Sequence, residues 1–319
     1  MAVGIGVALL VGAVVLVSLP DSPEVGTVPR TPPEPGLAAR VHDFATALRE
    51  NAPYRPPGDA QREALTGALA QLGRGASGAD AASEVTETRE ALTPLGFSVD
   101  VGVDTRTGRS YAVVASEPNA ERGWGLYVVD LSAPTRYAIQ VPHPANDLGT
   151  DALGVELFRR LPGAVLSVSG THRRVANGAG DVAHREDSMF SAVAEAHSRA
   201  KVPQVQLHGF DDASFPSADV VLSPGATDSL WPASAIADGV DGTGSSGNSR
   251  EKTDGPELDV CRAWERACGD LEGRRNVQGI AAAREGAPFA HIEVNRTTRD
   301  DPERWGELVR VIENTLRER

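Results

Sequence analysis

The chain has 319 residues, enough for one sizeable domain with attachments or for two small domains. Hydrophobic residues make up 40% and charged residues 24% of it, as is ordinary for a globular protein, whereas aromatic residues reach only 5%, so a core must consist mainly of Val, Leu and Ala. The formal net charge of −13 argues against a nucleic-acid-binding surface, because phosphate contacts need clustered lysines and arginines.

An apolar run opens the chain: residues 2–19 (AVGIGVALLVGAVVLVSL) carry no charge. At about 1.5 Å per residue, such a run nearly matches a bilayer core of roughly 30 Å. The basic n-region and the cleavage pattern of a signal peptide are not clear, so for residues 1–19 we favour an uncleaved transmembrane anchor over a signal segment. Either interpretation predicts a domain outside the cytoplasm, held at the cell membrane or secreted if the segment is cleaved. A proline-rich linker is expected at 20–36.

A single α/β domain is predicted over residues 37–319. In its first part, residues 37–95, apolar residues recur every three to four positions, which is typical of amphipathic helices. The period then changes to two, and a TRTG turn between two alternating segments predicts a hairpin. The segments expected as strands here are residues 97–103, 111–115, 124–131 and 137–141.

Strand and helix patterns alternate in the rest of the chain. Such alternation predicts an α/β fold with a mixed sheet and helices on both faces. Asp301 as N-cap and Pro302 at the first helical position indicate the start of a last helix. The strands are expected at residues 164–169, 202–207, 218–223 and 289–294, and helices at 151–161, from 187 or 188 onward, and after 301.

Only two cysteines occur, Cys261 and Cys268, and no CxxC pair suggests a thiolate-held metal. In one regular helix, residues seven apart would lie about 10 Å apart, too far for a disulfide. If the segment bends, a disulfide fits an extracytoplasmic protein, and this is the alternative that we favour. The preceding Gly/Ser/Asp-rich residues 238–255 are expected to form a surface loop.

Two histidines and one carboxylate follow predicted strands. His143 and Asp147 stand four apart in a turn that contains Pro and Gly (AIQVPHPANDLGT), and His208 ends another strand directly before Gly209. In open α/β sheets, ligands bind beyond the strand ends, and this donor set suits an open zinc site. The alternatives are that His143 packs in its turn while Asp147 caps the next helix, and that His208 is a buried, hydrogen-bonded side chain.

Glu293 lies in the middle of the apolar strand FAHIEVN. A carboxylate there is costly to bury unless it is paired or catalytically active, and exclusion of water would raise its pKa towards that of a useful general base. The alternative is a salt bridge, for instance with Arg296 or Arg173.

Two short basic clusters are candidates for substrate binding. Arg173 and Arg174 follow a strand end, where guanidinium groups could bind a carboxylate in bidentate fashion. His184 and Arg185 precede a helix N-terminus, which itself favours anions. Either cluster could instead be solvated surface. Other chemistries are disfavoured, because the chain lacks G-x-S-x-G, HExxH and the glycine-rich nucleotide-binding motifs.

The order of these motifs resembles a known family. H-(turn)-D-x-G-T-D at His143–Asp151, LHG at Leu207–Gly209 and E-x-N-R at Glu293–Arg296 are similar to motifs of the phage-type poly-γ-glutamate hydrolases and the N-formylglutamate amidohydrolases. Both groups are zinc amidohydrolases with a fold similar to the zinc carboxypeptidases. The resemblance covers roughly residues 137–299. It implies Zn²⁺ held by His143, Asp147 and His208, with Glu293 as general base.

The sequence departs from this family at the first ligand pair. Here Asp147 replaces a Glu and lies one residue closer to the histidine, and Pro144 replaces a Gly. A shorter carboxylate can still reach a metal, so the departures leave the zinc site in place and the exact substrate open.

The sequence therefore favours an extracytoplasmic zinc-dependent amidohydrolase that cleaves an amide bond of a small acidic substrate, such as a γ-glutamyl or cell-wall peptide. The main alternative is a membrane-tethered binding or scaffold module that retains the hydrolase fold without its reaction. Phosphoester hydrolysis would need more converging carboxylate ligands than the motifs supply.

Overall fold

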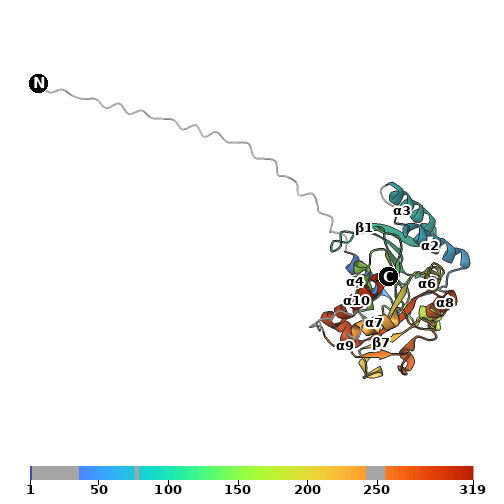
Figure 1. The fold of residues 1–319 in the computed structure, drawn as a ribbon. Helices are drawn as coiled ribbons and strands as arrows, with labels where there is room; N and C mark the ends of the chain where they lie inside the picture. The colour runs from blue at the N-terminus through green and yellow to red at the C-terminus, as the bar shows by residue number, and fades with distance from the viewer. Residues whose placement is uncertain (2–35, 76–78, 242–255, 319) are drawn as a thin grey trace. The chain divides into compact units, whose positions relative to one another are not determined.

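One nine-stranded sheet crosses the computed structural model, which describes residues 36–75, 79–241 and 256–318 together with Met1 (Figure 1). All helices and strands described lie in the unit of residues 35–319. The strand order is β1-β2-β3-β5-β4-β6-β9-β7-β8. The strands are Phe97–Val103 (β1), Ser110–Ser116 (β2), Leu126–Asp130 (β3), Tyr137–Val141 (β4), Ala164–Val168 (β5), Gln204–Phe210 (β6), Val220–Ser223 (β7), Val260–Arg262 (β8) and Phe289–Asn295 (β9).

The sheet is mixed, as the sequence predicts. Strands β1, β2, β3 and β5 are antiparallel to their successive neighbours, whereas β5, β4, β6 and β9 run parallel to one another. Strand β7 is antiparallel to β9 and parallel to β8. Because four adjacent strands run the same way, their carboxyl ends meet at one edge, which is where open α/β sheets bind ligands.

Helices cover both faces of this sheet. Helices α1, α4, α7 and α10 pack on one face, and α2, α3, α6 and α8 on the other (Figure 1). The α-helices are Leu37–Ala47 (α1), Asp59–Leu72 (α2), Ala79–Leu92 (α3), Thr150–Arg160 (α4), Val175–Gly178 (α5), Met189–Arg199 (α6), Ala233–Val240 (α7), Val277–Glu285 (α8), Arg296–Asp300 (α9) and Pro302–Arg317 (α10). Short 3-10 helices are Thr93–Leu95 (η1), Val182–His184 (η2), Asp212–Ser214 (η3) and Gly269–Glu272 (η4).

Burial explains why some strands are continuous apolar runs in the sequence, whereas others alternate between apolar and polar residues. Strands β3, β4, β5 and β9 are buried along their whole length between the two helical layers. Strand β1 lies at the edge of the sheet, where Val101 and Val103 face solvent. The predicted hairpin is confirmed, since β1 and β2 pair in register from Phe97 opposite Ser116 to Val103 opposite Ser110.

The last helix begins as predicted. The Asp301 side chain accepts hydrogen bonds from the amides of Glu303 and Arg304, and Pro302 occupies the first helical position. Helix α10 buries Leu308 and Ile312 on its inner face, whereas Trp305 is only half-buried. The Ser188 alternative for the start of α6 is also confirmed, because its side chain accepts from the amide of Ser191.

Besides the short helices α5 and α9, two longer helices were not predicted. Helix α8 buries Gln278, Gly279 and Ala282, so its inner face lacks the large apolar residues on which the 3.6-residue pattern depends. Helix α7 precedes the expected surface loop and extends into it as far as Val240. The remainder of that predicted loop, residues 242–255, lies outside the described residues.

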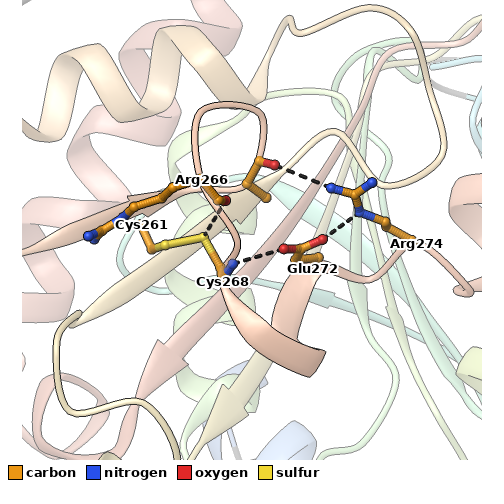
Figure 2. Close-up of a disulfide and its surroundings, with 6 residues drawn as sticks. Cys261, Arg266, Cys268, Glu272 and Arg274 are labelled. Atoms are coloured by element: carbon orange, nitrogen blue, oxygen red, sulfur yellow. Dashed lines mark hydrogen bonds and ion pairs between the residues drawn. A yellow bond between two sulfur atoms is a disulfide. The ribbon is translucent and has the colours of Figure 1, made fainter.

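The segment CRAWERAC bends instead of forming one helix. Strand β8 contains Cys261, a turn follows, and Cys268 stands directly before η4. The two Cα atoms are 6.1 Å apart and the predicted disulfide is present (Figure 2).

The predicted membrane anchor at residues 2–19 and most of the predicted linker, up to residue 35, lie outside the described residues. In the part of the chain that the structure describes, no helix combines the length and the apolar character needed to cross a bilayer.

Candidate metal centre

All four side chains predicted as metal ligands or general base come from neighbouring parallel strands and the turn beyond one of them. His143 follows β4 after Pro142, and the turn closes when the Asp147 amide donates to the His143 carbonyl at 2.8 Å. His208 lies near the end of β6 and is paired in register with Glu293 on β9. The parallel order of the strands therefore brings these residues to one edge of the sheet.

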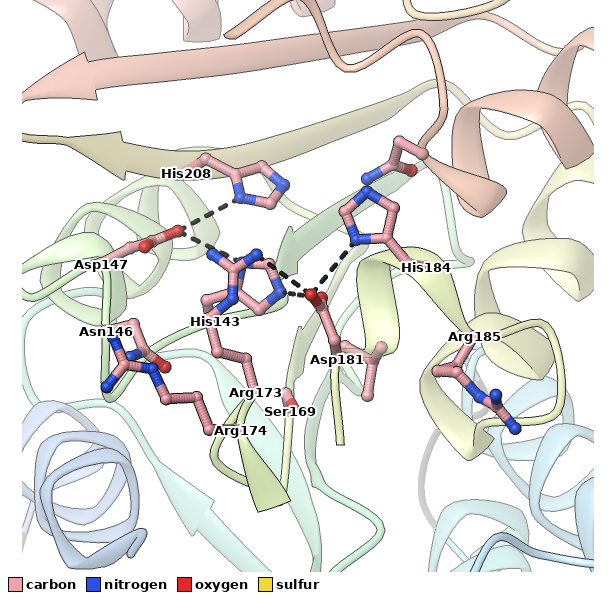
Figure 3. A network of polar contacts seen from close by, with 12 residues as sticks. His143, Asn146, Asp147, Ser169, Arg173, Arg174, Asp181, His184, Arg185 and His208 are labelled. Carbon is pink, nitrogen blue, oxygen red and sulfur yellow. Dashed lines mark hydrogen bonds and ion pairs between the residues drawn. The ribbon is translucent and has the colours of Figure 1, made fainter. Parts of the chain in front are cut away.

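The two histidines and Asp147 form a tight cluster (Figure 3). The Nδ1 atoms of His143 and His208 lie 3.5 Å and 3.2 Å from the same oxygen, Oδ2 of Asp147. The imidazole rings meet edge to face with centroids 5.0 Å apart. All three side chains are buried, with exposed fractions of 2% for His143, 6% for Asp147 and 5% for His208.

The far nitrogen of each imidazole has an acceptor of its own. Nε2 of His143 lies 2.7 Å from Oδ1 of Asp181, and Nε2 of His208 lies 2.9 Å from Oε1 of Gln206. Because an imidazole donates to such an oxygen through its N–H, these partners place the proton on Nε2 and leave the lone pair on Nδ1. Both Nδ1 atoms are then presented to the Asp147 carboxylate without a proton.

A network of amide side chains sets the orientation of Gln206. Its Nε2 donates to Oε1 of Gln140 at 2.8 Å and to Oε1 of Gln278 at 3.1 Å, so its own Oε1 faces His208. Asn276 donates to the same Oε1. With the Gln206 amide in this orientation, every N–H donor of the network faces an oxygen. Turning the amide over would place oxygen against oxygen and nitrogen against nitrogen.

Burial keeps His208 neutral. Desolvation is the largest influence and lowers the pKa of His208, Asp147 acts to raise it, and His143 acts in the same direction as desolvation. A neutral His208 with its proton on Nε2 directs a lone pair at a carboxylate oxygen only 3.2 Å away. Two lone pairs at this distance repel each other unless a cation lies between them.

The geometry fits a divalent metal ion. In a tetrahedral zinc site with bonds of 2.0–2.1 Å, neighbouring donor atoms are ~3.3 Å apart, close to the 3.2 Å and 3.5 Å measured from Asp147 to the two nitrogens. Nδ1 of His143 is buried and makes no hydrogen bond within the described part of the chain. Three protein donors leave a fourth position for a water molecule or a substrate, which is the arrangement of catalytic zinc sites.

The charges of the three side chains depend on one another. Burial alone would raise the pKa of Asp147, but His143 and His208 outweigh it and hold that pKa well below the usual range. Burial also acts to lower the pKa of His143, yet the carboxylates of Asp147 and Asp181 raise it overall. Asp147 is therefore fully ionised, as a metal ligand must be.

Glu293 stands beside this cluster in a different electrostatic state. Burial, and then the negative charge of Asp147, raise the pKa of Glu293 well above its ordinary value. The described structure shows no ion pair of Glu293 with Arg296 or Arg173, because Arg296 pairs with Asp300 and Arg173 with Asp181. A carboxyl group with a raised pKa can accept and return a proton near neutral pH.

His291 is a further buried side chain at the site. Its ring stacks on that of His208 with centroids 4.6 Å apart, and its Nε2 lies 4.0 Å from Oε1 of Glu293. Burial lowers the pKa of His291 well below the ordinary value, so this ring is neutral. His208, His291 and Glu293 form a second possible set of metal ligands, which shares His208 with the first set. Its distance of 4.0 Å between His291 and Glu293 is longer than the 3.2 Å and 3.5 Å between the donor atoms of the first set.

A pocket of about 660 Å³ opens over these residues. One part of its wall consists of Arg173, Ala183 and His184, and another part is the segment from Gly269 to Asn276. Arg173 and His184 both pair with Oδ2 of Asp181, at 3.0 Å and 3.3 Å (Figure 3). Asp181 therefore links the metal cluster to the cationic wall of the pocket.

The disulfide supports the part of the pocket wall formed by the segment from Gly269 to Asn276. The amide of Cys268 donates to Oε1 of Glu272 at 2.8 Å, and Glu272 in turn pairs with Arg274 (Figure 2). Gly273 in the same segment packs against the His291 ring, where a Cβ atom would come within 2.4 Å of the imidazole. The loop thus depends on a covalent bond at its base and on a glycine at its closest approach to the site.

Two of the predicted substrate-binding residues lie elsewhere. Arg174 reaches Glu50 at 3.6 Å, and Arg185 pairs with Asp187 at 2.7 Å. Figure 3 shows Arg185 directed away from His143. Among the described residues that line the pocket, neither appears. Adjacent residues of a short cluster point to different sides of their turn, so Arg173 and His184 line the pocket while Arg174 and Arg185 face outward.

Sequence reasoning also missed four contributors, Asp181, Gln206, His291 and Asn276. Asp181 belongs to the DVAHREDS run, and Gln206 and His291 lie two residues before His208 and Glu293, on the same strand face. That two-residue spacing was a usable signal. No such signal existed for Asp181, because its partner, His143, lies 38 residues away in the chain.

Comparisons with known proteins leave the family open. No protein-family model matches the sequence, and no curated protein does. Among solved structures, the chain is similar to a gene product of Agrobacterium tumefaciens, with 12% identity, a TM-score of 0.38, and coverage of 58% of this chain and 88% of that one.

Two proteins of Shewanella denitrificans are also similar in structure. A proposed carboxypeptidase A has 12% identity and a TM-score of 0.35, with coverage of 75% of this chain and 68% of that one. A proposed metallopeptidase has 13% identity and a TM-score of 0.31, with coverage of 72% and 87%. All three TM-scores are below 0.5, so we base the metal centre on the geometry of its own residues.

Proposed function

We propose that this protein is a zinc-dependent amidohydrolase that acts on an acidic amide. The observation that carries the proposal is the neutral His208, whose unprotonated Nδ1 faces a carboxylate oxygen of Asp147 at 3.2 Å. A cation between the two removes their repulsion, and the donor set of two imidazoles and one carboxylate is that of a catalytic zinc site.

Each residue of the cluster has a distinct part in this proposal. Nδ1 of His143, Oδ2 of Asp147 and Nδ1 of His208 hold the ion, while Asp181 and Gln206 keep both imidazoles in the ligating tautomer. When bound, zinc supplies a Lewis acid that polarises an amide carbonyl and lowers the pKa of a water molecule.

Glu293 moves the proton. Its carboxylate accepts a proton from the attacking water and then returns it to the amide nitrogen as the C–N bond breaks. The raised pKa of Glu293 suits both steps, because the group binds the proton firmly enough to carry it and releases it to a basic nitrogen.

The cationic wall supports an acidic substrate. Arg173 lines the pocket and uses only part of its fork of donors on Asp181, so the rest can bind a carboxylate. His184 lies on the same wall. We propose a γ-glutamyl or cell-wall peptide as substrate class, in keeping with the resemblance to poly-γ-glutamate hydrolases and N-formylglutamate amidohydrolases and with their carboxypeptidase-like fold.

The same proposal places the domain outside the cytoplasm, tethered by residues 1–19 or secreted. Two features support this location, the charge-free apolar run at residues 2–19 and the disulfide between Cys261 and Cys268.

Metal analysis of the purified full chain tests the proposal. We expect one zinc per chain, turnover of N-acylglutamate and γ-glutamyl amides, and loss of both zinc and turnover in His208→Ala. His42→Ala is the matched control, since the exposed His42 pairs with Asp151, belongs to neither possible set of metal ligands and should keep both properties. A zinc-free wild type contradicts the proposal, and zinc without turnover on any amide favours the non-catalytic binding module.

A further inference from the structure

Arg299 on α9 is a buried arginine whose guanidinium spans three separate segments. Nη1 donates to the Leu148 carbonyl at 2.7 Å, Nη2 to the Phe210 carbonyl at 3.0 Å, and Nε to the Asn295 carbonyl at 3.4 Å. The residue is only 7% exposed. In the described part of the chain its hydrogen bonds all go to main-chain oxygens, so its charge is not neutralised by direct contact with a carboxylate.

Each of these carbonyls lies within two residues of a residue of the proposed active site. Leu148 directly follows Asp147, Phe210 comes two residues after His208, and Asn295 comes two residues after Glu293. The three segments otherwise belong to different elements, namely the turn after β4, the end of β6 and the end of β9. One planar group with donors in a fixed geometry therefore holds the backbone of all three together.

The position of the Arg299 guanidinium explains why a glycine, Gly209, follows His208. A Cβ atom on Gly209 would lie 2.3 Å from Cζ and from Nη1 of Arg299, a distance that no real Cβ contact shows. The guanidinium thus crosses the β6 backbone at the one residue that has no side chain, and any other residue at 209 must displace it.

Burying the charge of Arg299 costs free energy, which favours a specific role for this residue. A buried cation without a carboxylate partner is unfavourable unless charge-assisted hydrogen bonds compensate, and the three carbonyls supply these. Asn295 already caps α9 through its side chain, which accepts from the Thr298 amide at 2.8 Å, so α9 does not need Arg299 for its own start.

We propose that Arg299 is a positioning residue that fixes the relative placement of Asp147, His208 and Glu293. It touches none of the reacting atoms and acts through the backbone next to each. The effect on metal affinity rests on the proposed function, whereas the effect on the backbone of the two ligand-bearing segments does not.

Two measurements on the full chain test this role, made on wild type, Arg299→Ala, Arg299→Lys and Arg296→Ala. The first is hydrogen–deuterium exchange of the metal-free protein, and the second is zinc affinity in competition with a chelator. Arg296→Ala is the matched control, because Arg296 lies on the same helix but is only half-buried and pairs with Asp300 through its side chain.

In Arg299→Ala we expect faster exchange confined to residues 147–150 and 209–212, and zinc affinity lower by about 10–100-fold, the usual effect of losing a group that orients metal ligands. Added guanidinium ion should restore part of the affinity. Arg299→Lys should lie between Arg299→Ala and the wild type in both exchange rate and zinc affinity, since one ammonium group cannot reach three carbonyls. Arg296→Ala should match the wild type.

Gly209→Ala provides a second route that keeps the arginine. Its methyl group displaces the guanidinium, so it should reproduce both effects even if Arg299→Ala does not fold. Affinity within about twofold of wild type in both variants, or faster exchange spread evenly over the chain, overturns the inference. A wild type that binds no zinc rejects the proposed function instead, and the exchange pattern of the metal-free protein still decides the role of Arg299.

Discussion

Asp181 is the residue on which both halves of the site depend. It accepts from Nε2 of His143 through one oxygen, and the other oxygen pairs with Arg173 and His184. Burial acts to raise the pKa of Asp181, but its partners, His143 first and then Arg173, hold it well below the usual range. The carboxylate therefore stays ionised, contacts His143, a proposed metal ligand, and holds two side chains that line the pocket.

Asp181→Asn tests this role. An amide in place of the carboxylate weakens the hydrogen bond that keeps the proton on Nε2 of His143, so zinc affinity should fall by about 10–100-fold in a chelator competition. Asp187→Asn, which disturbs only the outward-facing pair with Arg185, should bind zinc as the wild type does. Equal affinities for all three proteins would show that Asp181 does not orient His143.

Glu293 should be needed for the reaction and dispensable for the metal. Glu293→Gln keeps the shape of the side chain but cannot accept a proton, so amide hydrolysis should fall by about 10²–10⁴-fold. Zinc content should remain at one per chain, because the cluster of His143, Asp147 and His208 is complete without this residue. Undiminished turnover in the variant would exclude Glu293 as the general base.

The raised pKa of Glu293 also predicts how stability depends on pH. In metal-free protein the folded chain keeps this proton at pH values where the unfolded chain, with a pKa near 4.5, has released it. The contribution of Glu293 to stability is therefore complete below that pH and is lost as the pH rises towards the folded pKa. Urea unfolding between pH 4.5 and 7 should show a steeper decline in wild type than in Glu293→Gln, and parallel curves would contradict the raised pKa.

At the scale of elements, the loop between β8 and α8 is the part of the site with the least regular structure. Its wall of the pocket, from Gly269 to Asn276, contains one short 3-10 helix and ends at Asn276, which caps α8 and also contacts Gln206. A disulfide at one end and an amide contact at the other therefore hold the loop against the metal centre.

Removing the disulfide should loosen this wall without removing the metal. In Cys261→Ser/Cys268→Ser the unfolded chain regains the freedom of a closed loop of about eight residues, so the free energy of unfolding should fall by roughly 2–3 kcal/mol. The KM of the amide substrate should rise while zinc content stays the same. Dithiothreitol should lower the free energy of unfolding and raise the KM of the wild type, and it should leave both quantities unchanged in the double variant. Loss of zinc from the double variant would mean that the loop also holds the metal centre.

At the scale of the whole molecule, the metal centre joins elements that are far apart in the chain. His143 follows β4, His208 lies on β6 and the neighbouring Glu293 on β9, in the middle of the sheet. If zinc binds here as proposed, it binds the folded chain only, so it should raise the stability of the fold as a whole.

The size of that stabilisation can be stated in advance. Free zinc at 100 times its dissociation constant should add about 2.7 kcal/mol, which for a chain of this length corresponds to a rise in Tm of roughly 5 °C. His208→Ala should show no rise, and His42→Ala should show the full one. A rise that persists in His208→Ala would place the bound zinc at another site.

Most elements of the fold could be predicted because their patterns are local. The alternation in β1, the long apolar strands and the cap formed by Asp301 and Pro302 each depend on residues within a few positions of one another. Helix α8 escaped prediction because its buried face is made of Gln278, Gly279 and Ala282, and nothing in that pattern distinguishes inside from outside.

The sequence by itself determined the alternation of strands and helices and placed His143, Asp147, His208 and Glu293 at strand ends or within strands, since these features follow from short-range periodicity. Only the tertiary structure decided which of them meet, that Asp181 and Gln206 set their tautomers, and that Arg299 holds their backbones together. It also separated Arg173, in the pocket, from Arg174, outside it. The physical reason is that these contacts join residues tens of positions or more apart, and their partners are set by strand order and packing, which no local pattern contains.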